Sequence, residues 1–173
     1  MALKCADSQN DRNSVMVDQN SVTITRRLEF DAGHRIPNHA GKCCHLHGHR
    51  YAIELTVSGP VHASRGQSDD GMVIDFGDIK QLALKHLVEP WDHAFLVSKH
   101  DTVLVKFLES LPSHKTVILE DVPTVENLVK FAFDILAQVF TTETKGQMVL
   151  QAIRLYETPN CWADYRAKSG PKT

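Results

Sequence analysis

The sequence has no long hydrophobic run, no excess of charge of one sign and no regular cysteine framework. No stretch approaches the ~20 consecutive apolar residues of a membrane span, so we expect no membrane partner. Nineteen Lys and Arg against 21 Asp and Glu give a formal charge of −2, which argues against a polybasic nucleic-acid binder and an acidic disordered chain. The four cysteines have no disulfide-like spacing, which favours a reducing compartment; they are Cys5, Cys43, Cys44 and Cys161.

The N-terminal segment also lacks targeting features. Residues 1–20 are polar and contain neither the apolar stretch of a signal peptide nor an Arg-rich amphipathic pattern. We therefore expect a cytoplasmic protein with a loose tail over residues 1–20. The remaining length corresponds to about one domain, so a single catalytic domain is expected over residues 21–173.

The apolar pattern predicts both strands and helices. Four strands are expected, over residues 22–30, 47–58, 148–157 and 162–165. Helical spacing predicts a helix that begins after Asp75 and ends at Pro90, and a longer helix capped by Thr124. A short amphipathic stretch over residues 102–109 is a further candidate helix. This order indicates an α+β domain, in which helices cover one face of an antiparallel sheet.

Histidine is the residue type that departs most from ordinary composition: there are ten, and five lie between His34 and His49. His47 and His49 are two apart on a predicted strand, so both point to one face with Cα atoms roughly 6.5–7 Å apart. His34 lies at the end of the preceding strand, on its core side. If the two strands form a hairpin, three imidazoles meet, and they predict a catalytic zinc site with an open position.

The adjacent cysteines allow several interpretations. Cys43 and Cys44 precede His47 by four and three residues. A thiolate at this spacing could be a zinc ligand, or a reactive base or nucleophile of lowered pKa, and a buried cysteine could simply pack as a small apolar side chain. The spacing does not choose between these possibilities. A lone histidine at a strand end can likewise be an ordinary polar residue.

Several motifs in combination resemble one known family. They occur in a fixed order over most of residues 23–165 and read FDAGHRIPNHAGKCCHLHGHRY, GMVIDFGDIK, WDHAFL, PTVEN and YETP. The combination resembles the 6-pyruvoyl-tetrahydropterin synthase family. It is closer to the 6-carboxy-5,6,7,8-tetrahydropterin synthase branch, because the pyruvoyl branch typically has a longer gap between the cysteine and HGH.

The resemblance implies a particular architecture, the T-fold (tunnelling fold). In it, a four-stranded antiparallel sheet carries two helices on one face, and trimers close their sheets into a barrel. Closure by association removes exposed sheet edges. The resemblance further implies a homo-hexamer built as a dimer of trimers, with active sites between subunits.

The resemblance also implies roles for particular residues. The implied zinc ligands are His34, His47 and His49. The implied catalytic residues are Cys43 as the base, Asp92 and His93 as the pair that works with it, and Glu157 as a member of the relay. The implied pterin-binding residues are Thr124, Glu126 and Glu157, the last as the anchor of the ring. Cys44 matches no family role.

The implied activity is that of a zinc-dependent lyase in queuosine biosynthesis. It converts 7,8-dihydroneopterin triphosphate to 6-carboxytetrahydropterin, acetaldehyde and triphosphate. The alternatives are a 6-pyruvoyl-tetrahydropterin synthase and a non-catalytic zinc- or pterin-binding module. Candidate contacts for the triphosphate are Lys42, Arg35 and Arg50, which the sequence does not rank.

Overall fold

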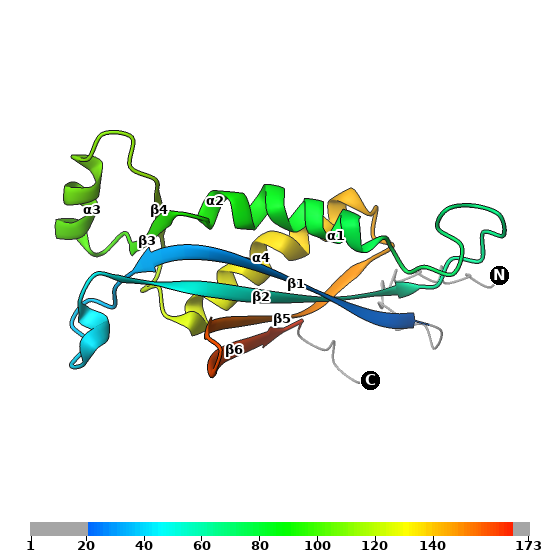
Figure 1. The fold of residues 1–173 in the computed structure, drawn as a ribbon, viewed down its shortest axis with the longest axis horizontal. Helices are drawn as coiled ribbons and strands as arrows, with labels where there is room; N and C mark the ends of the chain where they lie inside the picture. The colour runs from blue at the N-terminus through cyan, green and yellow to red at the C-terminus, as the bar shows by residue number, and fades with distance from the viewer. Residues whose placement is uncertain (1–20, 168–173) are drawn as a thin grey trace, which may run out of the picture.

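A long hairpin is the central feature of the structure. The computed structural model describes residues 21–167, and in it β1 (Ser21–His34) pairs antiparallel with β2 (His47–Pro60) along its whole length (Figure 1). The tail predicted for residues 1–20 lies outside the described residues. The hairpin was expected from the two alternating segments, and both strands are longer than the sequence pattern indicated.

The sheet around this hairpin has six strands, in the order β4-β3-β1-β2-β5-β6. On one side, β5 (Val149–Thr158) and β6 (Cys161–Arg166) add antiparallel to β2 and complete the expected four-stranded sheet. On the other side, β3 (Ala94–Ser98) and β4 (Thr116–Leu119) extend the sheet beside β1.

The two added strands were not predicted, because each is a short apolar run without alternation. They run parallel to β1 and to each other, and parallel neighbours need a crossover connection. The crossover contains α3 (Thr102–Glu109), which has the predicted bounds and lies at one end of the molecule, apart from the other helices (Figure 1).

Both predicted helix caps are present. The Asp75 carboxylate accepts a hydrogen bond from the backbone N of Gly77 at the start of α1 (Phe76–Ala83). The Thr124 hydroxyl accepts one from the backbone N of Asn127 at the start of α4 (Val125–Glu143). Each bond satisfies an amide that has no partner within the helix.

The first helix ends at Trp91, one residue after the predicted end at Pro90. The helix continues beyond α1 through η2 (Leu84–Val88), a π-helical segment, into α2 (Glu89–Trp91). In this segment the backbone N of Glu89 bonds the carbonyl of Leu84, five residues back. The π-helical segment ends just before Pro90, so the proline stands in the first turn of α2. A backbone N–H is not needed at that position, and the proline ring is therefore tolerated.

The core lies between the sheet and the helices that cover one of its faces, α1 and α4 (Figure 1). From β2 it contains every second residue, as alternation requires: Tyr51, Ile53, Leu55 and Val57, all fully buried. Ile153 and Leu155 continue this layer on β5. The covered face of β1 and β2 is therefore apolar until it reaches the histidines at the end of the hairpin.

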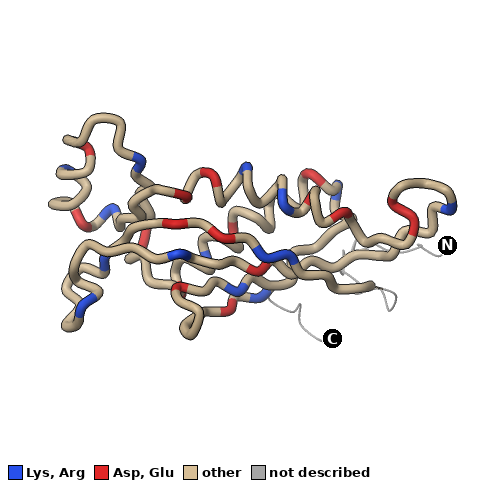
Figure 2. The backbone as a smooth tube through the Cα atoms, in the orientation of Figure 1, with Lys and Arg blue, Asp and Glu red and all other residues tan. Residues whose placement is uncertain are grey.

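The opposite face of the sheet carries charged side chains. Arg154 donates hydrogen bonds of 2.6 and 2.9 Å to Asp164, and Arg27 lies 3.5 Å from Glu54. Along the described chain the two signs of charge are interspersed (Figure 2). Within residues 21–167, no helix is long and apolar enough to span a bilayer.

Candidate metal centre

Three histidines meet at the end of the covered face of the hairpin. His34 stands directly opposite His47 in the strand register, and His49 follows on the same face. The ring centroids are 4.5 Å apart for His34 and His47, 5.2 Å for His34 and His49, and 5.0 Å for His47 and His49. One nitrogen of each ring lies within 4.8 Å of the others, so the group could bind a metal ion. The predicted convergence is confirmed.

Backbone carbonyls fix two of the rings. Nδ1 of His34 lies 2.7 Å from the carbonyl oxygen of Pro123, and Nδ1 of His47 lies 2.8 Å from that of His45. A carbonyl only accepts, so each Nδ1 carries the hydrogen and each neutral ring keeps a lone pair on Nε2. This outer-sphere bond to a carbonyl is the usual arrangement of a metal-ligating histidine.

The inner nitrogen of His34 is an unpaired polar atom in a buried place. His34 is fully buried, and its Nε2 has no hydrogen-bond partner among residues 21–167. Burial lowers the pKa of His34, against the opposing effect of its hydrogen bond to Pro123. Burial also lowers the pKa of His49, against the attraction of Glu157. Both imidazoles are therefore held neutral, the form that binds zinc, and the residues present fit such an ion.

Glu157 adds a carboxylate to the group, a placement that the sequence did not reveal. Its Oε1 lies 3.5 Å from Nε2 of His34 and 4.0 Å from Nε2 of His49. A carboxylate and an imidazole lone pair share no hydrogen, so they do not attract each other directly. A cation between them would be favourable for both, which is a second indication that this place suits a metal ion.

The start of α4 lies beside the histidines. Pro123, whose carbonyl holds His34, is followed directly by the helix cap Thr124. Glu126 is exposed in the first turn of the same helix. This hydrogen bond, between segments 89 residues apart, holds the start of α4 next to His34.

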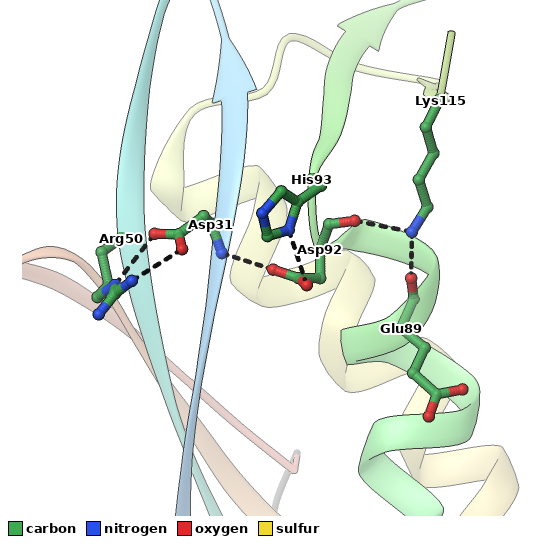
Figure 3. Close-up of polar contacts among 6 residues, drawn as sticks. All are labelled: Asp31, Arg50, Glu89, Asp92, His93 and Lys115. Carbon is green, nitrogen blue, oxygen red and sulfur yellow. Dashed lines mark hydrogen bonds and ion pairs between the residues drawn. The ribbon is translucent and has the colours of Figure 1, made fainter. Parts of the chain in front are cut away.

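Asp92 and His93 form a hydrogen-bonded pair in the turn before β3. Nδ1 of His93 lies 2.9 Å from Oδ2 of Asp92, and Oδ1 of Asp92 accepts a bond of 2.9 Å from the backbone N of Asp31 (Figure 3). That backbone bond lowers the pKa of Asp92, and the contact with His93 lowers it further, so the carboxylate is ionised. An ionised carboxylate can orient the imidazole and stabilise its charged form.

The turn itself is held by backbone bonds. His93 has φ +58°, a left-handed conformation that residues with side chains rarely adopt, and its N donates to the carbonyl of Asp31 at 2.6 Å. Lys115, from the segment before β4, donates to the carbonyl oxygens of Asp92 and Glu89 (Figure 3). No sequence pattern predicted this role of Lys115, because its partners are backbone atoms of a distant turn.

The Asp92–His93 pair does not face the three histidines within one chain. His93 is 76% exposed and lines a shallow depression of about 500 Å³ with Asp31 and Arg50, and His49 borders the same depression. Asp31 and Arg50 alternate with the histidines along their strands, so they lie on the opposite face of the hairpin. The structure brings together the predicted metal ligands and Glu157, and it places the predicted proton-relay pair elsewhere.

The loop between β1 and β2 carries the cysteines at the histidine end of the hairpin. Cys43 and Cys44 are half-buried in a short 3-10 turn, η1 (Lys42–Cys44). The carbonyl of Cys43 accepts a bond of 2.8 Å from the backbone N of Ile36, which closes the loop on itself. This bond holds the backbone of Cys43 in the loop that leads into His47.

The structure separates the three candidate phosphate contacts. Arg35 donates bonds of 2.6 and 2.7 Å to the buried carboxylate of Asp101. Arg50 donates bonds of 3.1 and 3.0 Å to Asp31. Lys42 is exposed and makes no ion pair with the part of the chain that the structure describes. A free ammonium next to Cys43 makes Lys42 the strongest candidate.

Comparison with known sequences gives a consistent result. The model of the 6-pyruvoyl tetrahydropterin synthase family matches residues 23–168. A Rickettsia bellii protein named 6-carboxy-5,6,7,8-tetrahydropterin synthase is 38% identical over 144 residues, which cover 83% of this chain and 99% of the relative. A Haemophilus influenzae protein of the same name is 32% identical over 146 residues, which cover 83% of this chain and 97% of the relative.

Solved structures show the same fold. The 6-pyruvoyl tetrahydropterin synthase of Plasmodium falciparum matches with a TM-score of 0.63 at 20% identity and covers 86% of this chain and 98% of its own. The Caenorhabditis elegans enzyme of the same name matches with a TM-score of 0.59 at 24% identity and covers 86% and 96%. The expected T-fold is confirmed, and the chain carries β3 and β4 beside its four antiparallel strands.

Replacing one ligand tests the metal centre. We expect His49→Ala to lose most of the bound zinc after dialysis against a mild chelator, because two imidazoles hold the ion far less tightly than three. His114→Ala is the matched control, since His114 is exposed and its ring bonds only the nearby Thr116 hydroxyl within the described residues. Zinc per chain is measured by atomic absorption. Equal zinc in His49→Ala and the parent would contradict this site.

Proposed function

The chain belongs to the 6-pyruvoyl tetrahydropterin synthase family, and we propose that it is a zinc-dependent 6-carboxy-5,6,7,8-tetrahydropterin synthase. It converts 7,8-dihydroneopterin triphosphate and water to 6-carboxytetrahydropterin, acetaldehyde and triphosphate, as a step of queuosine biosynthesis. The observation that carries the proposal is the three-histidine group with a carboxylate beside it. The names of the curated relatives support this branch over the pyruvoyl branch.

His34, His47 and His49 would hold the zinc ion. Bound zinc supplies Lewis acidity to the side-chain hydroxyls of the substrate, which acidifies the neighbouring C–H. The carbonyls of Pro123 and His45 keep two of the rings in the required tautomer. This arrangement means that metal binding needs no rotation of the His34 ring, which is fully buried.

Glu157 anchors the pterin ring at the edge of the metal group. A carboxylate accepts paired hydrogen bonds from the 2-amino group and the adjacent ring N–H, a geometry that also orients the ring. Glu157 is only partly exposed, so these bonds form in a largely desolvated place where they are strong. Thr124 and Glu126 line the pocket from the start of α4, and Lys42 holds the triphosphate as a point charge.

Proton transfer is the task of Cys43 and the Asp92–His93 pair. The Cys43 thiolate takes the proton from the acidified carbon, and His93, oriented by Asp92, relays it. The pair opens on the opposite face of the hairpin from the metal ligands. We therefore propose that Asp92 and His93 serve the site of another copy in a homo-hexamer, a dimer of trimers.

Product identity is the direct test of the proposed reaction. Zinc-loaded protein incubated with 7,8-dihydroneopterin triphosphate is expected to release acetaldehyde and 6-carboxytetrahydropterin in equal amounts, measured by derivatisation and mass spectrometry. A 6-pyruvoyl product would instead assign the chain to the pyruvoyl branch. An absence of turnover with zinc still bound would identify a binding module without activity.

The adjacent cysteines provide a matched pair for testing the base. Cys43→Ala is expected to lower the rate of product formation by at least ~10²-fold, the contribution typical of a general base, while zinc per chain stays unchanged. Cys44→Ala is the control, and it should retain most of the activity. Loss of zinc from Cys43→Ala would make this thiol a ligand, and equal activity of the two variants would show that neither is the base.

Mixing two inactive variants tests whether the site is shared between copies. His49→Ala lacks the metal ligand and His93→Ala lacks the relay, so neither is expected to turn over substrate. If each active site combines both residues from different copies, co-refolded mixtures contain some intact sites and recover a fraction of the parental rate. A mixture as inactive as its components, with hexamers formed, would place both residues of each site in one copy.

A further inference from the structure

Tyr51 is a buried polar residue next to the metal centre that the proposed reaction leaves unused. It lies two residues after His49 on the same face of β2 and is fully buried. Its ring stacks on Phe30 at a centroid distance of 5.3 Å. The ring also lies edge-on to His34 and His49, at 6.0 and 5.7 Å. The Tyr51 ring therefore packs directly against two of the imidazoles.

The hydroxyl of Tyr51 has no hydrogen-bond partner among the described residues. A buried polar atom without a partner costs free energy, so such a group generally finds one in the working state. The phenol of a tyrosine carries its hydrogen at neutral pH. The Tyr51 hydroxyl is therefore a hydrogen-bond donor without an acceptor among the described residues.

Glu157 is the acceptor that the surroundings offer. β2 and β5 pair up to Ala52 and Tyr156, and continuing this register by one residue puts Tyr51 beside Glu157. Phe30 offers no acceptor, and the Nε2 lone pairs of the two imidazoles point to the metal position. The carboxylate of Glu157 has lone pairs to spare after it meets two N–H groups of a pterin.

We propose that Tyr51 is a positioning residue, which donates a hydrogen bond from its hydroxyl to Glu157 and so holds the carboxylate for the pterin ring. Without this bond the carboxylate can remain near His34 and His49, where it competes for the open coordination position of the metal. With it, one oxygen is fixed and the carboxylate plane is set before the substrate arrives, which lowers the ordering cost of binding. This inference rests on the proposed function, because it assigns Tyr51 to the same pocket.

A double-mutant cycle on ligand binding tests the inference without turnover. The dissociation constant of unsubstituted pterin is measured by fluorescence for four zinc-loaded proteins: the parent, Tyr51→Phe, Glu157→Gln and the double variant. Tyr51→Phe removes only the hydroxyl and keeps the ring. We expect it to weaken binding about tenfold, the size of one hydrogen bond to a charged group. Glu157→Gln weakens binding at least as much, and the double variant binds no more weakly than Glu157→Gln alone.

The control and the outcomes separate this inference from the proposed function. Tyr165→Phe makes the same change on β6, where the ring packs on Phe133, and it should bind pterin like the parent. Unchanged binding in Tyr51→Phe, losses that add in the double variant, or loss of zinc from Tyr51→Phe would each overturn the positioning role. If Glu157→Gln also binds like the parent, the proposed pterin pocket itself is wrong.

Discussion

The antiparallel pairing of β1 with β2 is the constraint on which the rest of the structure depends. The register sets which residues share a face, and a slip by one residue would move every side chain of a strand to the other face. In the observed register His34 stands opposite His47, and the apolar stripe beneath them is continuous from the core to the metal group. The free energy of burying this stripe therefore also fixes the positions of the metal ligands.

The same alternation divides the chemistry between the two faces of one hairpin. The covered face carries the imidazoles, Tyr51 and Glu157, in surroundings that favour neutral rings and strong hydrogen bonds. The other face carries Asp31 and Arg50 and borders the exposed His93. A single chain therefore presents two partial sites, and in our proposal association of copies joins them. On that proposal, the activity depends on assembly.

The β3–α3–β4 unit supports the histidine end of the sheet. Its Asp101 is buried, begins α3 as a cap and also binds the guanidinium of Arg35, the residue directly after His34. Lys115 from the same unit holds the turn that carries Asp92 and His93. The unit therefore contacts the residue after His34 through an ion pair, and it contacts the Asp92–His93 turn through a hydrogen bond to a backbone carbonyl. Arg35 and Arg50 differ from Lys42 because each is already paired with a carboxylate: Arg35 with Asp101 of this unit, and Arg50 with Asp31 of β1.

The amino-acid sequence by itself determined the hairpin, the helix caps and the convergence of His34, His47 and His49, because alternation and capping are local patterns. Only the tertiary structure decided the position of Glu157 beside the imidazoles, the pairing of Arg35 with Asp101, the parallel strands β3 and β4, and the exposed position of His93 beside Asp31. Each of these depends on which distant segments pack together. Such contacts are set by the burial of the whole core, which no short stretch of sequence encodes.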